Sequence, residues 1–282
     1  MLIKRALTGI ALATAVGASI LLGPRWSAVL LIGLLVLAGA WEWGALIDQR
    51  LSPVVRALYV VVIALIMVLS WFATAQDPGV GVSIWWIAAA WWCLALVIVL
   101  RAGAEGIDEA VDGATPRTGW QRWAVALAGV LCLVPAWLGL GAVHAQSSGA
   151  WAMLTIIGLT VAADIGAYTI GRLFGRRRLL PRVSPGKTLE GLAGGVAWTV
   201  LLALLLSVLP VPTPPWFLLA AVVIALVSVL GDLTVSLFKR RAGVKHSGTL
   251  LPGHGGVLDR IDSFCATAPA WALWLAVAGG SA

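Results

Sequence analysis

Residues 216–262 read WFLLAAVVIALVSVLGDLTVSLFKRRAGVKHSGTLLPGHGGVLDRID. The first part, 216–238, is an apolar run of about the 20 residues that an α-helix needs to cross a membrane. The second part, 236–262, packs five Lys or Arg, two His, two Asp and five Gly into one block. Bare charges in hydrocarbon cost several kcal/mol each, so this block must lie in water or line a protein-made cavity. We therefore predict a membrane-spanning helix that ends in a binding site, and the excess of cations predicts an anionic ligand.

The whole chain has the composition of a polytopic membrane protein. Its mean hydropathy is +0.99, and 11% of its 282 residues are charged. Soluble domains typically carry about 25% charged residues. We expect an all-α polytopic integral membrane protein with about nine transmembrane helices. The expected spans are residues 6–23, 26–47, 54–72, 83–100, 123–143, 150–170, 192–209, 216–238 and 264–279.

The basic residues predict the orientation, because Lys and Arg are retained on the cytoplasmic side of a membrane. With nine spans and a cytoplasmic N-terminus, every one of the 19 Lys and Arg residues except Arg25 falls in a cytoplasmic segment. The polar site loops then lie on the cytoplasmic face. The pI is about 10, but the charges are divided among short loops, so nucleic acid is not an expected partner.

Two halves of the chain differ in character. Residues 1–143 hold about five of the expected helices, and their loops are plain. Residues 144–282 form the predicted catalytic half, which carries the polar loops 171–191 and 236–262. No internal repeat is evident, which gives an inverted-repeat transporter little support.

Three acidic residues fall within or at the ends of expected spans, where an ionisable group marks a functional site by default. Glu42, in AWEWG, lies near the inner end of its span, and we favour a structural role at the membrane interface. Asp164 lies about two helical turns before the first basic loop, and Asp232 about one turn before Ser236. We expect Asp164 and Asp232 to serve the site.

The spacing around Asp232 favours phosphate and metal chemistry. On a helix, Asp232, Ser236 and Lys239 with its neighbour fall on one face, which presents a carboxylate, a hydroxyl and cations. The glycines of PGHGG (252–256) let backbone N–H groups approach an anion. A hard ion such as Mg²⁺ takes one or two carboxylates and leaves its other positions to water and phosphate, which suits Asp232 and Asp259. The surrounding cations would clamp a polyphosphate, so nucleotide or phospholipid headgroup chemistry is indicated.

The first basic loop adds Lys187 and Thr188 beside glycines. Its GKT triplet lacks the first glycine and the strand that a P-loop needs, so a Walker-type ATPase is disfavoured. Zinc is disfavoured too, because neither the three histidines nor the three cysteines form a paired ligand motif. The cysteines are expected to fill the core.

The polar block resembles the signature of the phosphatidate cytidylyltransferase family, also called CDP-diacylglycerol synthases. That signature runs from a Ser to Lys-Arg, then Lys-Asp, a small residue, Pro-x-His-Gly-Gly and Asp-Arg-x-Asp. DIGAY from Asp164, SPGKTLEG from Ser184 and AWEWG from Ala40 are also similar to family segments, so the resemblance covers nearly the whole chain. The matching residues of the main signature are Ser236, Lys239, Arg240, Lys245, Gly248, Pro252, His254, Gly255, Gly256, Asp259, Arg260 and Asp262.

The resemblance implies a CTP-dependent nucleotidyltransferase of phospholipid synthesis. Family members join CTP to phosphatidic acid with Mg²⁺, giving CDP-diacylglycerol and pyrophosphate; a second metal ion is left open, and dimeric members imply a homodimer. We expect CTP, phosphatidic acid and membrane lipids as partners, in the bacterial inner (plasma) membrane with the active site facing the cytoplasm. The expected catalytic residues are Asp232, Asp259, Lys239 and Lys245, with Asp232 and Asp259 as metal ligands. The expected substrate-binding residues are Ser236, Arg240, His254, Gly255, Gly256, Arg260, Asp262, Lys187 and Asp164.

Two departures from the family pattern leave competing interpretations open. Where such proteins commonly have Glu in GDLxES, this chain has Val235, and where the signature has Lys-Asp, this chain has His246 after Lys245. Each removes a carboxylate from the site region, and histidine adds a charge that changes near neutral pH. The alternatives are a catalytically weakened or inactive relative, an anionic-lipid transporter, or the same chemistry on another lipid phosphate or nucleotide.

Overall fold

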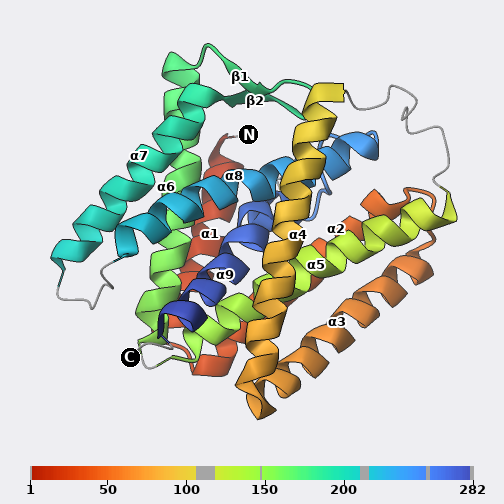
Figure 1. The fold of residues 1–282 in the computed structure, drawn as a ribbon. Helices are drawn as coiled ribbons and strands as arrows, with labels where there is room; N and C mark the ends of the chain where they lie inside the picture. The colour runs from red at the N-terminus through yellow and green to blue at the C-terminus, as the bar shows by residue number, and fades with distance from the viewer. Residues whose placement is uncertain (1, 106–117, 147, 210–215, 252–254, 280–282) are drawn as a thin grey trace.

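The computed structural model describes residues 2–105, 118–146, 148–209, 216–251 and 255–279 (Figure 1). Within these ranges the chain forms nine α-helices and one small β-hairpin, which confirms the all-α prediction apart from the hairpin. The elements are α1 (Leu2–Leu21), α2 (Arg25–Ile47), α3 (Pro53–Gln76), α4 (Pro78–Glu105), α5 (Gly119–His144), α6 (Gly149–Phe174), β1 (Arg178–Leu180), β2 (Ser184–Thr188), α7 (Leu189–Val208), α8 (Phe217–Arg241) and α9 (Leu258–Gly279).

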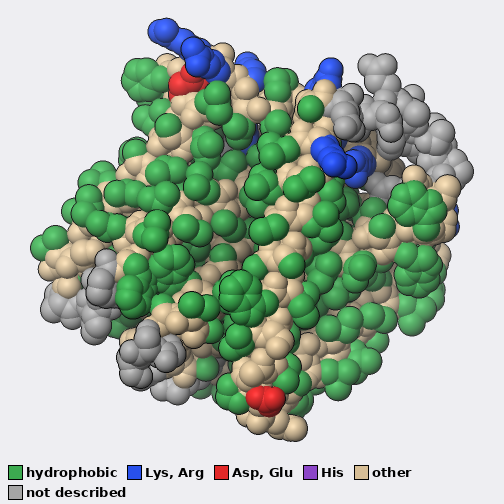
Figure 2. All heavy atoms as spheres, in the orientation of Figure 1, with side chains coloured by type: hydrophobic (Ala, Val, Ile, Leu, Met, Phe, Trp, Pro, Cys, Tyr) green, Lys and Arg blue, Asp and Glu red, His purple; other side chains and the backbone are tan. Residues whose placement is uncertain are grey.

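Eight of the described helices, α2 to α9, are long and apolar enough to cross a membrane. Hydrophobic side chains cover the middle of the molecule, as Figure 2 shows for one face, and many of them are large Leu, Val and Trp residues that are exposed. Such a surface is stable against lipid and unfavourable in water. The chain is therefore an integral membrane protein, while the exact number of spans and their orientation stay predictions.

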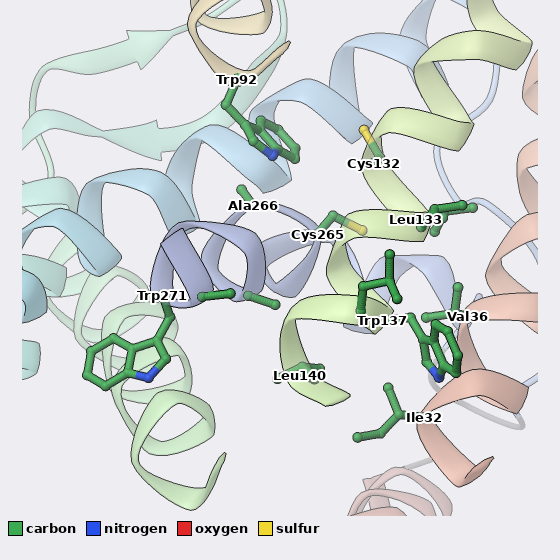
Figure 3. Packing of buried hydrophobic residues seen from close by; sticks show 14 of the residues in the cluster. Ile32, Val36, Trp92, Cys132, Leu133, Trp137, Leu140, Cys265, Ala266 and Trp271 are labelled. Atoms are coloured by element: carbon green, nitrogen blue, oxygen red, sulfur yellow. The ribbon is translucent and has the colours of Figure 1, made fainter. Parts of the chain in front are cut away.

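Helices α2, α5 and α9 lie at the centre of the bundle and share its main apolar core (Figure 3). Trp43 of α2 is fully buried, and its indole N–H donates to the carbonyl of Val125 on α5 at 2.9 Å. Cys132 and Cys265 are buried in this core as expected, but Cys93 is exposed on α4, so the prediction was wrong for Cys93. The division of the chain at residues 143 and 144 stays a prediction.

The C-terminal ends of α2, α4, α6 and α8 lie at one end of the bundle (Figure 1). Arg122, at the start of α5, forms an ion pair with Asp48, at the end of α2, at 2.7 Å. The guanidinium of Arg182, in the hairpin turn, donates to the carbonyl of Ala104 at the end of α4. Figure 2 shows Lys and Arg side chains gathered at the end that carries the hairpin in Figure 1. One end of the molecule is therefore polar and basic.

Small residues bring α6 and α7 into close contact. A Cβ atom at Gly166 of α6 would lie 2.6 Å from the carbonyl oxygen of Gly194 on α7, and one at Gly195 would lie 2.8 Å from the carbonyl of Ala163. Such close approach between small residues is typical of helix pairs in membranes. The β-hairpin connects the end of α6 to the start of α7, and its second strand, β2, contacts α8. This placement lets Lys187 of β2 reach Asp232 of α8.

Both polar loops are shorter than the sequence predicted. In the loop 171–191, Arg178–Leu180 pairs antiparallel with Ser184–Thr188. In the loop 236–262, residues up to Arg241 continue α8, and α9 begins at Leu258. The expectation that a loop delivers Asp259, Arg260 and Asp262 was therefore wrong, because these residues lie in the first turns of α9.

Candidate active site

The candidate site lies where α8 and α9 approach each other at the basic end. A Cβ atom at Gly231 would lie 2.5 Å from the carbonyl oxygen of Asp262, so only glycine permits this approach. Asp232 follows Gly231 directly, and its side chain is therefore held near the first turns of α9. The close crossing concentrates the acidic residues of two helices in a small volume.

Asp232 accepts from a hydroxyl on its own helix and from a cation on the hairpin. The Ser236 hydroxyl donates to Oδ1 of Asp232 at 3.1 Å, as the i, i+4 spacing predicted. Lys187, on β2, lies with Nζ 2.7 Å from Oδ2 of Asp232. The side chains of Lys187 and Asp232 are 23% and 32% exposed, so this ion pair is partly open to solvent.

Asp259 forms a second ion pair, and this one is buried. Nζ of Lys239 lies 2.7 Å from Oδ1 of Asp259, and both side chains are 10% exposed. The backbone N–H of Ser247 donates to Oδ2 of Asp259 at 3.3 Å. Nδ1 of His246 lies 3.5 Å from that same oxygen. The loop between α8 and α9 thus folds back over the first turn of α9.

Two further carboxylates extend the polar region along the helices. Asp262 is buried, and its Oδ1 accepts from the backbone N–H of Ser263 at 2.9 Å. Asp164 of α6 is exposed, and its Oδ1 accepts from the hydroxyls of Ser228 at 3.1 Å and Ser263 at 3.3 Å. Asp164 therefore joins α6 to both α8 and α9, and its predicted role in the site stays a prediction.

The loop after α8 turns sharply at two glycines. Gly243 has φ +70° and Gly255 has φ +87°, values that favour glycine because they cost a side chain steric energy. The backbone N–H of Leu251 donates to the carbonyl of Gly255 at 3.0 Å, which closes the loop upon itself. These turns direct the chain back toward the N-terminus of α9.

The structure brings together Asp232, Ser236 and Lys187 in one cluster and Asp259, Lys239 and His246 in another. Arg240 is half-buried, while Lys245 and Arg260 are exposed, all at the same end of the molecule. Gly256 is buried beneath the loop. His254 lies outside the described residues. The roles assigned to these residues from the sequence stay predictions.

The two departures from the family pattern lie in different surroundings. Val235 is fully buried and belongs to the main apolar core, so a carboxylate there would not face the ion pairs. His246 is 66% exposed and lies beside Asp259. Of the two departures, only His246 therefore changes the chemistry next to a predicted site residue.

Glu42 is a residue whose role the sequence analysis missed. It was expected to reach the membrane interface, but it is 3% exposed and accepts three hydrogen bonds from the loop and from the start of α9. Its position in AWEWG at the basic end of α2 was the available signal. Nothing in the sequence indicated which distant segment it would meet.

The donor set fits a hard divalent ion held by few protein ligands. Asp232 and Asp259 supply carboxylate oxygens, and cations flank both. Among the residues that the structure describes, no three or more His, Cys, Asp or Glu side chains form a ready metal cage. Mg²⁺ is commonly bound by one or two carboxylates together with substrate phosphates and water. The arrangement therefore suits an ion that arrives with a polyphosphate.

Comparisons with known proteins match nearly the whole chain. A family model described as the cytidylyltransferase family matches residues 3–278. A phosphatidate cytidylyltransferase of Pseudomonas aeruginosa is 39% identical over 268 residues, which cover 90% of this chain and 89% of that protein. Another from Haemophilus influenzae is 33% identical over 293 residues, covering 95% and 96%. One from Bacillus subtilis is 45% identical over 111 residues, covering 38% and 41%.

Proposed function

This chain belongs to the cytidylyltransferase family, and from that membership we propose that it transfers the cytidylyl group of CTP to phosphatidic acid. The products are CDP-diacylglycerol and pyrophosphate, which makes the protein a CTP-dependent nucleotidyltransferase of phospholipid synthesis. The observation that carries the proposal is the pair of Asp–Lys clusters at the basic end of a membrane-embedded bundle. Two relatives that match almost the whole chain bear the name of this activity.

The reaction requires positioning and charge neutralisation more than proton transfer. A phosphate oxygen of phosphatidic acid attacks the α-phosphorus of CTP; a new P–O bond forms, and the bond to the bridging oxygen of the β-phosphate breaks. The attacking phosphate is already ionised near neutral pH, so no strong general base is needed. Lys187 and Lys239 are placed to offset the charge on the phosphates, and Arg240 and Lys245 extend this field toward water.

Asp232 and Asp259 are the proposed ligands of Mg²⁺. When bound, the ion would neutralise phosphate oxygens and so stabilise the leaving pyrophosphate. Their carboxylates already lie among cations, which keeps both ionised side chains compensated before substrate arrives.

The basic end is proposed to face the cytoplasm from the bacterial inner membrane. The gathering of Lys and Arg there supports this orientation, since basic loops are retained on the cytoplasmic side. CTP then arrives from water, and phosphatidic acid arrives from the bilayer. A homodimer is proposed from the family resemblance alone, and crosslinking in native membranes would test it.

The test is turnover by the purified full-length protein. With CTP, phosphatidic acid and Mg²⁺, CDP-diacylglycerol should form, and chelation of the metal by EDTA should stop its formation until Mg²⁺ is restored. Activity that persists in EDTA would remove the metal from the proposal. Lipid binding without any turnover under these conditions would favour the silent-relative alternative.

A transporter is the competing class of function. Alternating access requires polar groups that both sides of the membrane can reach in turn. The two described Asp–Lys pairs lie at one end of the bundle, which favours chemistry at a single face. Flux of phosphatidic acid across proteoliposomes by variants that lack turnover would support the transporter instead.

A further inference from the structure

A buried carboxylate from the N-terminal half holds the loop that surrounds Asp259. Oε2 of Glu42 accepts from the Ser247 hydroxyl at 2.7 Å and from the backbone N–H of Leu258 at 2.9 Å. Its Oε1 accepts from the backbone N–H of Val257 at 3.0 Å. One side chain of α2 therefore joins the middle of a distant loop, at Ser247, to the start of α9. The side-chain amide of Gln49, just after α2, also donates to the carbonyl of Ala242, where this loop begins.

The two backbone donors are Val257, directly before α9, and Leu258, the first residue of α9. The first N–H groups of a helix have no partner within it, and the helix dipole favours negative charge at that end. Glu42 therefore acts as an N-terminal cap supplied by another helix. This explains why α9 begins at Leu258, several residues earlier than the apolar pattern indicated.

Two glycines of the loop fit closely around this carboxylate. A Cβ atom at Gly248 would lie 2.4 Å from Oε1 of Glu42, and one at Gly256 would lie 2.4 Å from Oε2. Neither position has room for a side chain. The loop is therefore shaped to enclose Glu42, and the glycines serve this contact as well as any approach to an anion.

Two of the residues that donate to Glu42, Ser247 and Leu258, are also directly connected to Asp259. Ser247 donates its hydroxyl to Glu42 and its backbone N–H to Asp259. Leu258 donates its N–H to Glu42 and directly precedes Asp259 in the chain. We infer that Glu42 is a positioning residue, which sets the place of the Asp259 carboxylate beside Lys239 by holding Ser247 and the start of α9. The inference rests on the proposed function only for the task that Asp259 performs.

The test replaces Glu42 with Gln, which keeps the size but places an amide N–H₂ against N–H and O–H donors. Hydrogen exchange followed by mass spectrometry should show faster exchange at residues 247, 257 and 258, with α6 and α7 unchanged. Turnover should fall about 10- to 100-fold, as is typical for residues that orient a metal ligand. Asp48→Asn is the matched control, because it removes a carboxylate from the same end of α2 that pairs with Arg122 instead.

A second pair of variants separates positioning from a general loss of stability. Ser247→Ala should lower turnover less than Glu42→Gln, and the double variant should be no slower than Glu42→Gln alone, since both act through one contact. If Glu42→Gln does not fold, Ser247→Ala alone should still speed exchange at 257 and 258. Normal exchange at these amides, or additive losses of turnover, would overturn the inference. If the wild type proved to lack cytidylyl transfer, the exchange measurements would still decide whether Glu42 holds the loop.

Discussion

The Lys187–Asp232 pair and the Lys239–Asp259 pair have the same N–O distance, 2.7 Å, but different surroundings. In the first pair, a lysine on the hairpin reaches across to α8, and both side chains are partly open to solvent. In the second pair, both side chains are buried between α8 and α9, and the loop held by Glu42 covers the carboxylate.

This difference separates two tasks within one site. An open pair can exchange its partners at little cost, because water compensates the charges while they part. A buried pair cannot, because a lone charge left behind would be uncompensated. Lys187 and Asp232 therefore suit direct exchange of partners with an incoming phosphate and ion, whereas Asp259 would bind the ion from a fixed place without parting from Lys239.

The largest effect is expected when each aspartate is replaced by Asn. Both Asp232→Asn and Asp259→Asn should abolish turnover, a loss of about a thousandfold or more. Only Asp259→Asn should also lower the free energy of unfolding strongly, by about 3 kcal/mol, because Lys239 would stay buried without its partner. Asp232→Asn should cost about 1 kcal/mol or less.

Turnover of CTP and thermal unfolding in detergent would measure these effects. Near-normal turnover in both variants would show that the metal assignment is wrong. A greater loss of stability in Asp232→Asn than in Asp259→Asn would reverse the comparison between the open and the buried pair.

Replacing the lysines should give the next largest effect. Lys187→Met should slow turnover about 10- to 100-fold and leave the unfolding temperature within about 2 °C of the wild type, because its partner remains solvated. Lys239→Met should lower both turnover and the unfolding temperature, since it strands Asp259 in a buried position. Equal stability of the two variants would remove the distinction between the pairs.

A smaller effect is expected at the exposed edge of the buried pair. His246→Asp restores the acidic residue of the family pattern beside Asp259. It should raise turnover by about fivefold at most, or widen the pH range over which the enzyme is active. Rates measured from pH 5.5 to pH 9 would test this. A large loss of activity would instead show that the histidine has acquired a role of its own.

The smallest effect on chemistry is expected at Val235. Because its side chain lies in the apolar core, Val235→Ala should leave turnover of the folded enzyme unchanged and cost about 1–2 kcal/mol of stability. Turnover measured at a temperature well below the unfolding transition would separate an effect on chemistry from an effect on stability. A marked fall in turnover of fully folded protein would place this position in the site.

The local features of the site followed from the sequence, because they depend on neighbours along the chain. The hydrogen bond from Ser236 to Asp232 is an i, i+4 contact, and the apolar runs predicted the helices to within about six residues at each end. The ends of α8 and α9 were misjudged, since their last and first turns carry charged residues that look like loop. These turns are helical because packing at Gly231 and the cap from Glu42 stabilise them.

Which cation meets which carboxylate was not available from the sequence. Lys239 was expected on the same edge as Asp232, yet it pairs with Asp259, while Asp232 receives Lys187 from the hairpin. Such pairings depend on how α6, α7, α8 and α9 cross. Crossing angles could not be predicted from the sequence, because they depend on which small residues of one helix meet the backbone of another.

The sequence by itself determined that this is a membrane protein of the cytidylyltransferase type, with its polar residues in two basic segments. Hydropathy and motif spacing are properties of neighbouring residues, so they can be read directly along the chain. Only the tertiary structure decided that Glu42 caps α9, that Val235 faces the core and that one ion pair is open while the other is buried. Burial and long-range hydrogen bonds depend on segments that lie about 200 residues apart in the chain and meet only when the helices pack.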